Sequence, residues 1–405
     1  MKIYIFITFS IVSVGGSQIY VRNKLRYLRD GGWIVKVFSC AKGEIYIHDL
    51  NTEKKNIIPD LRYYPQVLSL RRQNSILSCL SEDCDNSDEI IVESHSISFG
   101  IWGEKLASKL GAKHLLFSME EENAVLNQSI YDFLKFKLDN KSLVGITSKN
   151  IIAMFPEESN LMEQDLHLGA SCSNTIEDYN SSWIDKVKNI EVDYKVCIIG
   201  RLDKNFIYSS SKDLSIFIEN HKEKKFLVFY IGGGNEIKIR NLFKTLQNCQ
   251  VIFSGPMYPM PRRLLKLFDV FIGSSGSANA PSQVGKLCIS YDAKDLSPIG
   301  IYSVTTNNTL FRDKEPILPL SYYLDSILFE HKYKDSKTEN IKRCGNFDNH
   351  IERVELIETN KYYDTKKIYF SKKFILRNKL KRMSYFMVGD NIYSKFSALC
   401  YKKNV

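Results

Sequence analysis

The sequence lacks a long hydrophobic run. Nowhere in its 405 residues does an apolar segment approach the roughly 18 residues that a membrane-spanning helix needs. The first ten residues, MKIYIFITFS, are apolar, but their single lysine and the Gly15-Gly16 pair that follows make a poor secretory leader. We interpret this start as a buried β-strand. We therefore expect the protein in the cytoplasm or on the inner face of the plasma membrane.

Paired cysteines and metal-ligand clusters are missing as well. The nine cysteines form no C-x-x-C pair, and no cysteine stands near a histidine at the spacing of a zinc site. Several lie inside expected strands, where cysteine behaves as a small buried hydrophobe. This pattern indicates a reducing compartment and argues against a metal centre, so we expect no metal and no cofactor.

Acidic residues are outnumbered by basic ones. The 56 lysines and arginines against 46 aspartates and glutamates give a net charge of +10. Much of the excess lies in the tail, 367–405, where basic residues alternate with Phe, Tyr, Leu and Met. Two interpretations stay open: a solvated helix face, or a basic amphipathic surface held to anionic lipid. The net charge alone would permit nucleic-acid binding, but no sequence motif supports it.

Short apolar runs alternate with helical patterns along the chain. Strands are expected at 3–9, 33–38, 89–92, 113–117 and 143–147, and again at 196–199, 226–231, 250–253, 269–272 and 287–291. Helices of ten or more residues between such strands predict βαβ units and mainly parallel sheets. We predict an α/β fold of two doubly wound, Rossmann-like domains: residues 1–170, a linker at 171–194, residues 195–366, and a basic helical tail at 367–405.

Five short motifs carry a family resemblance. They are Gly15-Gly16 before a helix, VCIIGRLD at 196–203, FLVFYIGGGN at 226–235, VIFSG at 251–255, and the strand and loop at 265–275. In this order they resemble the motifs of GT-B glycosyltransferases, in particular the retaining group that builds capsule and O-antigen glycans. The resemblance extends over most of the chain. It implies two Rossmann-like domains facing a central cleft, with a nucleotide-sugar donor bound mainly by the second.

The resemblance assigns donor binding to several residues, each with a chemical reason. Arg201, at the end of a strand, offers a planar fork of donors to a diphosphate. Lys204 adds a second positive charge, although the family places its lysine slightly later. Gly15, Gly16 and Gly233 permit a positive φ and a close backbone approach to the ligand. The alternatives are surface ion pairs for the two cations and ordinary turns for the glycines.

Residues 271–279, FIGSSGSAN, contain very little side-chain bulk. In the family such a loop lies beneath the donor phosphates, where backbone amides and a helix dipole bind anions. We expect this role for the loop and the following turn, at Ser274, Ser275, Gly276, Ser277 and Asn279. A turn dictated by packing is the alternative. The family's pair of glutamates in the next helix is absent, which leaves Asp292 as a candidate for a ribose or sugar hydroxyl; a solvated turn explains Asp292 equally well.

In the first domain, the resemblance draws attention to the ends of two strands. His95 follows an apolar strand, where the family often places a histidine that faces the donor sugar. Glu120 and Glu121 follow the next strand and are candidates for orienting the acceptor hydroxyl or acting as base. The alternatives are a structural histidine and a helix start rich in glutamate.

The function implied by the resemblance is metal-independent glycosyl transfer, specifically of a hexose. The expected partners are a nucleotide-sugar donor, a lipid-linked or growing polysaccharide acceptor in bacterial surface glycan synthesis, and an anionic membrane surface. Two alternatives remain. One is a non-catalytic glycosyltransferase-like subunit that binds a sugar nucleotide or a partner enzyme, which the missing glutamates favour. The other is a sugar-nucleotide epimerase of similar architecture.

Overall fold

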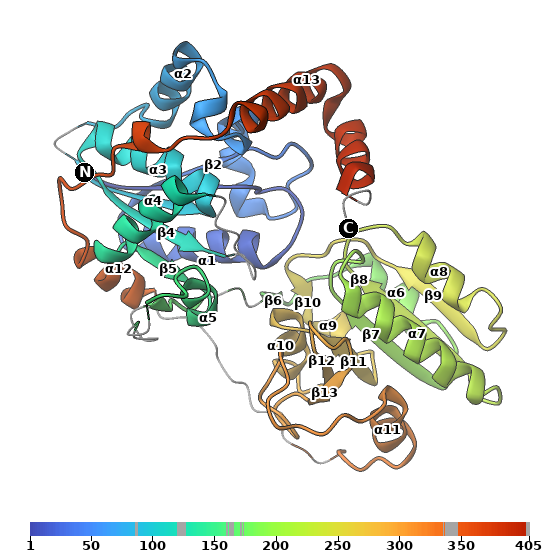
Figure 1. Ribbon diagram of the computed structural model, residues 1–405. Helices are drawn as coiled ribbons and strands as arrows, with labels where there is room; N and C mark the ends of the chain where they lie inside the picture. Colours follow the sequence, from blue (N-terminus) through green and yellow to red (C-terminus); the bar gives the residue numbers. More distant parts are fainter. Residues whose placement is uncertain are drawn as a thin grey trace. The chain divides into compact units, whose positions relative to one another are not determined.

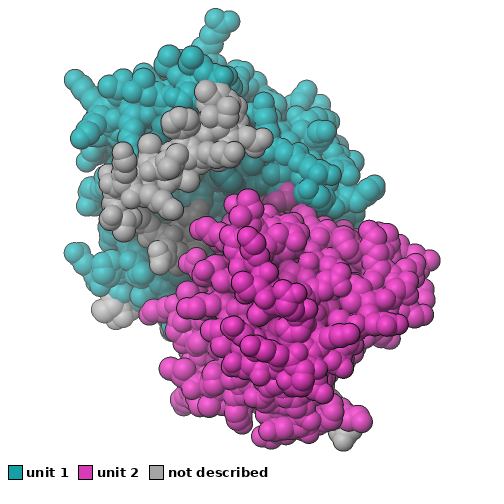
Figure 2. All heavy atoms as spheres, turned by 90° about the vertical axis from the view of Figure 1, so that its right-hand side faces the viewer, with its two compact units in different colours: residues 1–12, 21–170, 345–405 teal, residues 13–20, 171–344 magenta. Residues whose placement is uncertain are grey.

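The computed structural model describes residues 1–405 except 86–87, 120–126, 159–160, 162–165, 171, 173, 335, 337–346 and 402–405. The chain forms two compact units, which Figures 1 and 2 show. Unit 1 comprises residues 1–12, 21–170 and 345–405, and unit 2 comprises residues 13–20 and 171–344. Each unit contains a largely parallel sheet with helices, so the predicted α/β class is confirmed.

Unit 1 is organised around a parallel sheet in the order β2-β1-β3-β4-β5. Its strands are β1 (Lys2–Thr8), β2 (Ile34–Ser39), β3 (Glu89–His95), β4 (Lys113–Ser118) and β5 (Leu143–Gly145). After their first residue, β1, β3 and β4 are buried along almost their whole length. Burial on both faces explains why apolar residues follow one another without alternation at 3–7, 90–92 and 115–117 within these strands.

The helices of unit 1 follow from apolar stripes and recognisable ends. They are α1 (Gly16–Asp30, of which residues 21–30 belong to unit 1), α2 (Leu70–Leu80), α3 (Ile97–Leu110), α4 (Gln128–Asp139), α5 (Ser148–Ile152), α12 (Asp348–Glu355) and α13 (Lys372–Tyr401), with 3₁₀ turns at His48–Asn56, Pro59–Arg62, Pro65–Val67 and Thr365–Lys367. On α1, Val21, Leu25 and Leu28 are buried as their spacing predicts. Gly111, at φ 66°, ends α3 in the left-handed conformation that glycine favours.

Unit 2 contains a six-stranded sheet in the order β13-β12-β11-β7-β8-β9. Its strands are β7 (Tyr194–Ile199), β8 (Phe226–Ile231), β9 (Cys249–Phe253), β11 (Val270–Gly273), β12 (Cys288–Tyr291) and β13 (Pro298–Ile301), and a separate pair joins β6 (Ile176–Glu177) to β10 (Met260–Pro261). The helices are α6 (Ser182–Lys188), α7 (Asn205–Asn220), α8 (Ile237–Phe243), α9 (Arg262–Leu265), α10 (Gly276–Ser282) and α11 (Leu320–Leu324), followed by a π-helical turn at Asp325–Phe329. Only the β12–β13 pair is antiparallel within the larger sheet.

The division into units differs from the predicted domain boundaries in several stretches. Residues 13–20 were expected in the first domain, but they belong to unit 2. The sequence suggested a linker at 171–194, but β6 and α6 in this stretch pack on β10 and α9 of unit 2. Residues 345–366 were expected in the second domain, yet they belong to unit 1. The reason is specific packing: Phe347 contacts Tyr27, and His350 bonds to Lys24 of α1.

The expectation for the glycines at the start of α1 is also corrected. The helix begins at Gly16. Neither Gly15 nor Gly16 has a positive φ; the residue in that conformation is Ser13, at φ 69°. A β-carbon added to Gly16 would make only ordinary contacts, 3.8 Å from Cβ of Cys172. The two glycines therefore leave space rather than supply an unusual backbone conformation.

Candidate functional site

The order of strands in unit 2 locates a ligand-binding edge. The chain builds β7, β8 and β9 toward one side and then returns to place β11 on the other side of β7. In open α/β sheets, ligands bind at the carboxyl ends of the strands at such a reversal of strand order. Ile198 and Ile272 are register partners, so the segments that follow β7 and β11 emerge side by side. These segments carry Arg201 and the 273–277 loop, the residues singled out from the sequence.

Arg201 and Lys204 bring positive charge to this edge. Both side chains are exposed, and Lys204 occupies the N-cap position of the 16-residue helix α7 without making a capping hydrogen bond. The first turn of α7 contains no acidic residue. Cations at a helix N-terminus add to the positive end of the helix dipole, an arrangement that favours a bound anion. Asp203 is the local counter-charge, 3.5 Å from Nε of Arg201.

The glycines after β7 and β8 allow their two loops to touch. A β-carbon on Gly232 would lie 1.9 Å from the carbonyl oxygen of Gly200. This distance is too short for two non-bonded atoms, so no residue with a side chain fits at position 232. One residue further, the carbonyl of Gly233 accepts a hydrogen bond of 2.9 Å from the amide of Leu202. The triple glycine is thus explained by close packing beside Arg201. Contact between Gly233 and a nucleoside remains a prediction.

The loop after β11 uses most of its own polar groups. The Ser277 hydroxyl accepts from the amide of Ser274 at 3.0 Å and donates to its carbonyl at 2.7 Å. The amide of Ser275 donates to the carbonyl of Thr309, and Ser274 Oγ donates to the same carbonyl. Within the described residues, three hydrogen-bond donors of this loop have no partner: the amide of Gly276, the hydroxyl of Ser275 and the side-chain nitrogen of Asn279. Any phosphate contact by this loop therefore falls on these three groups.

The positive φ of this turn belongs to a serine. Ser275 precedes α10 with φ 55° and ψ −131°, whereas Gly276 has ordinary backbone angles. A non-glycine residue in such a conformation is strained, and strain of this kind gathers at functional sites. Gly276 has a different role, because a β-carbon there would come within 3.1 Å of the Cys172 carbonyl oxygen, a contact tight enough that the backbone would have to shift. Cys172 also lies beside Gly16, so the two glycine-containing loops meet at this residue.

Asp292 organises the chain behind this loop. The carboxylate of this buried residue accepts the amides of Lys294 and Asp295 on one oxygen, and the amide of Arg312 on the other. These bonds account for the burial of Asp292 without a ligand, and its contact with a sugar hydroxyl stays a prediction. The alternative, a solvated turn, does not apply, because Asp292 is only 4% exposed.

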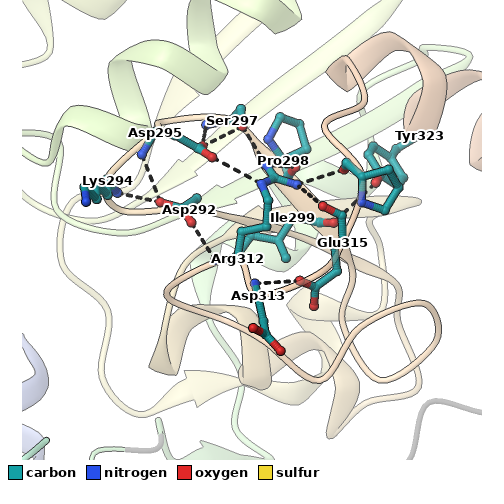
Figure 3. Close-up of polar contacts among 11 residues, drawn as sticks. Asp292, Lys294, Asp295, Ser297, Pro298, Ile299, Arg312, Asp313, Glu315 and Tyr323 are labelled. Atoms are coloured by element: carbon teal, nitrogen blue, oxygen red, sulfur yellow. Dashed lines mark hydrogen bonds and ion pairs between the residues drawn. The ribbon is translucent and has the colours of Figure 1, made fainter. Parts of the chain in front are cut away.

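Arg312 connects this turn to the next segment of the chain, as Figure 3 shows. Its guanidinium donates to the carbonyls of Pro298 and Pro316, each at 2.8 Å, and pairs with Asp295. Burial would raise the pKa of Glu315, but hydrogen bonds from Thr306, the Asp313 amide and Asn308 lower it to about 2. The network holds 305–315 in place and with it the Thr309 carbonyl that supports Ser275.

The corresponding reversal in unit 1 lies between β1 and β3. His95 ends β3, and its Nδ1 is 3.0 Å from the Thr8 hydroxyl at the end of β1. Its Nε2 donates to Glu93 Oε1 at 2.9 Å, because a carboxylate can only accept. His95 is 5% exposed, and both ring nitrogens are engaged. Its contact with a donor sugar stays a prediction. Ser96, the next residue, has φ 73°, so a positive-φ serine precedes a helix at the reversal in each unit.

A buried charged network supports His95. Glu93 accepts hydrogen bonds from Lys24 Nζ and the Tyr4 hydroxyl, each at 2.5 Å, and all three side chains are inaccessible to solvent. Lys24 also donates to Nδ1 of His350, whose Nε2 donates to the Gly169 carbonyl. Burial alone would raise the pKa of Glu93, but the Lys24 ammonium and His95 hold it well below its usual range.

Sequence reasoning missed this network, although two signals were present. Glu93 and His95 are two apart in an apolar strand, which places both side chains on the same face. Lys24 lies between Val21 and Leu25 within the buried stripe of α1, where a lysine requires a partner. His350 carried no signal, because nothing in the sequence shows that residues 345–355 return to unit 1. Glu120 and Glu121 lie outside the described residues.

No group of three or more His, Cys, Asp or Glu side chains within the described ranges is arranged to hold a metal ion. Across the same ranges, no helix has both the length and the apolar character to span a bilayer.

Comparison with known proteins gives a match in structure but none in sequence. No protein-family model and no curated protein matches the chain. A glycosyltransferase from Rickettsia africae is similar over 96% of this chain and 99% of its own, with 14% identity and a TM-score of 0.55. Anabaena HepE, solved with UDP and glucose, covers 95% of this chain and 100% of its own, with 12% identity and a TM-score of 0.52.

A variant of S. aureus TarM, solved with fondaparinux, alpha-GlcNAc-glycerol and UDP, is similar over 89% of this chain and all of its own, with 9% identity and a TM-score of 0.52. The chain has the GT-B glycosyltransferase fold. At such low identities the likeness establishes the fold alone, and the activity must be argued from the site.

Proposed function

We propose that the protein is a glycosyltransferase that binds a nucleotide-sugar donor at the carboxyl ends of β7 and β11 in unit 2. The observation that carries the proposal is the coincidence of three features at one sheet edge. The strand order reverses there, Arg201 and Lys204 add to the positive end of α7, and the neighbouring loop leaves the Gly276 amide free of partners in the described chain.

The chemistry of glycosyl transfer requires this kind of site. Negative charge grows on the nucleotide diphosphate as its bond to the sugar breaks, and preorganised donors stabilise that charge. Arg201 supplies a planar fork of N–H groups, whereas the Gly276 amide supplies a fixed dipole. A cationic group in this place performs the task that a metal ion performs in other enzymes, so we propose metal-independent transfer. The sugar is proposed to be a hexose.

The acceptor is proposed to be a lipid-linked or growing polysaccharide in bacterial surface glycan synthesis, at the inner face of the plasma membrane. His95 is proposed to face the donor sugar, with Glu93 fixing its tautomer through the Nε2–H donation. The clustered glutamates Glu120 and Glu121 are proposed to bind the acceptor hydroxyl or to serve as base. Support for these roles comes from the resemblance of the motifs and from the place of His95 at the end of β3.

Incubation with radiolabelled UDP- and GDP-sugars and a bacterial lipid extract tests the proposal. Label in the lipid fraction is the expected result. The matched pair of variants is Arg201→Ala and Arg240→Ala, since both arginines are exposed on unit 2 and both pair with a nearby carboxylate, Asp203 and Glu236 respectively. Transfer should fall only in Arg201→Ala.

Two other outcomes would contradict transferase activity. Interconversion of the free nucleotide sugar, with no label in lipid, would identify an epimerase. Tight binding of a sugar nucleotide without turnover, over a panel of donors and acceptors, would identify a non-catalytic subunit.

A further inference from the structure

The helix α13 has one face docked on unit 1. Phe374 packs on Tyr64, and the guanidinium of Arg62 stacks over the ring of Tyr385 at 4.0 Å. Arg382 makes two hydrogen bonds, of 2.7 and 3.1 Å, to the buried carboxylate of Asp60. These contacts fix the rotation of the helix about its axis. They therefore determine which side chains point away from unit 1.

An apolar stripe occupies the opposite face. Leu376, Leu380, Met383 and Met387 follow one another at intervals of four, three and four residues, the spacing of one helical face. Their exposed fractions are 60%, 54%, 60% and 82%. Exposed apolar residues scattered singly are ordinary, but a continuous stripe marks an interaction surface.

Positive charge flanks the stripe on both sides. At about 100° per residue, Lys372 and Lys379 fall on one side of the stripe, and Lys373 and Arg377 on the other. All four are exposed and form no ion pair with any residue that the structure describes. No acidic residue occurs between Lys372 and Met387. The face is thus apolar at its centre and uniformly cationic along its edges.

We propose that this outward face of α13 binds an anionic lipid bilayer. The four Leu and Met side chains insert shallowly, and the flanking lysines and arginine lie at the level of the lipid phosphates. A bilayer matches both features at once. A nucleic acid would leave the apolar stripe without a counterpart, and a stable protein interface would require more area than a single narrow stripe provides. The inference deepens the proposed function. Bilayer binding is argued from α13 alone, and only its link to a lipid-linked acceptor rests on the proposed function.

Vesicle flotation of the full chain, without sugar nucleotide, tests the inference. The probes are vesicles of phosphatidylcholine with phosphatidylglycerol, and vesicles of phosphatidylcholine alone. Each charge near an anionic surface changes partitioning about five-fold, so Lys373→Gln/Lys379→Gln should weaken binding about 30-fold. Leu380→Gln/Met387→Gln should weaken it by at least about ten-fold.

Matched controls lie elsewhere on the surface. Lys54→Gln/Lys55→Gln removes two exposed lysines from another part of unit 1, and Ile317→Gln removes an exposed apolar side chain of unit 2. Both controls should bind as the parent does. All the replaced side chains are exposed, so the variants should fold, as circular dichroism would verify.

Three results would overturn the inference: no binding of the parent to anionic vesicles, equal binding to neutral vesicles, or unchanged binding of either α13 variant. A dimer that dissociates in Leu380→Gln/Met387→Gln would also overturn it, because a second copy of the chain would then cover the stripe. Failure of the proposed function is separable. A chain that binds vesicles but transfers no sugar contradicts only the transferase proposal, and a chain that transfers sugar without binding vesicles contradicts only this inference.

Discussion

Replacing Glu93 with glutamine removes the negative charge at the centre of the buried network in unit 1. The substitution keeps the size of the side chain and its ability to accept from Tyr4. It leaves the ammonium of Lys24, whose Nζ is 2.5 Å from Oε2 of Glu93, buried without a counter-charge. Both side chains have no solvent exposure, so water cannot replace the lost partner.

The size of the effect follows from this burial. Removing one partner of a buried ion pair costs about 3–5 kcal/mol, whereas an exposed pair contributes about 0–1 kcal/mol. We therefore expect Glu93→Gln to lower the free energy of unfolding of unit 1 by about 3–5 kcal/mol. In the double variant Lys24→Met/Glu93→Gln no charge is stranded, so its loss should be clearly smaller than the sum of the two single losses.

Urea denaturation followed by tryptophan fluorescence measures these values. Trp33 and Trp102 belong to unit 1 and Trp183 to unit 2, so a Trp183→Phe background makes the signal report on unit 1. Glu89→Gln is the matched control. It lies on the same strand, and its ion pair with Lys2 is 3.6 Å long and more than half exposed on both sides.

The reasoning would be refuted if the double variant lost as much free energy of unfolding as the two single variants lose together. The reasoning would also be refuted if the free energy of unfolding of Glu93→Gln lay within about 1 kcal/mol of the parent value. A loss that small is expected only for the exposed control, Glu89→Gln. Either result would mean that Lys24 and Glu93 are not an ionised, mutually dependent pair.

Three further predictions concern the site, the metal and the histidines. Arg201→Ala should lower kcat/KM at least ten-fold, about 1.4 kcal/mol, with an unchanged circular dichroism spectrum; unaltered kinetics would exclude a role in charge stabilisation. Activity should survive excess EDTA, and a strict need for manganese or magnesium would contradict the metal-independent mechanism. Burial lowers the pKa of His114 and of His350 to about 4. The folded state then binds fewer protons than the unfolded state. The contribution of these histidines to the free energy of unfolding should therefore be fully present above about pH 6.5 and should fall toward pH 4 by up to about 1.4 kcal/mol per pH unit for each histidine. His350→Gln should reduce this slope in denaturation curves at several pH values, and an unchanged slope would show that His350 does not titrate in this range.

The sequence predicted the strands well because they are buried on both faces. Each expected strand of the two large sheets occurs within a few residues of its predicted place, and 226–231 coincides with β8. Helices were predicted less well. The sequence gives no clear start for α7, because Lys204 at the N-cap makes no capping hydrogen bond and the polar run at 209–213 interrupts the apolar pattern of the helix.

What could not be predicted depends on contacts between distant segments. The return of 345–355 to unit 1 is fixed by single pairs such as Lys24 with His350, which periodicity does not reveal. Likewise, Ser275 combines its positive φ with a hydrogen bond from its amide to the Thr309 carbonyl, 34 residues further along the chain. Sequence composition identified the loop as small and polar, but only the structure shows which of its amides are free to bind an anion.

Calorimetric titration of UDP and GDP tests the central claim, that a donor nucleotide binds at the carboxyl ends of β7 and β11. The parent chain should bind at least one of the two. Gly276→Val should abolish this binding, because a β-carbon there already lies 3.1 Å from the Cys172 carbonyl and its methyl groups would shield the free amide. Ser275→Ala removes one hydroxyl donor but leaves the Gly276 amide in place, so it should weaken binding far less than Gly276→Val. Arg201→Ala, which replaces an exposed side chain, should also bind more weakly than the parent. A folded Gly276→Val protein that binds nucleotide as tightly as the parent, together with an unaffected Arg201→Ala protein, would contradict the account.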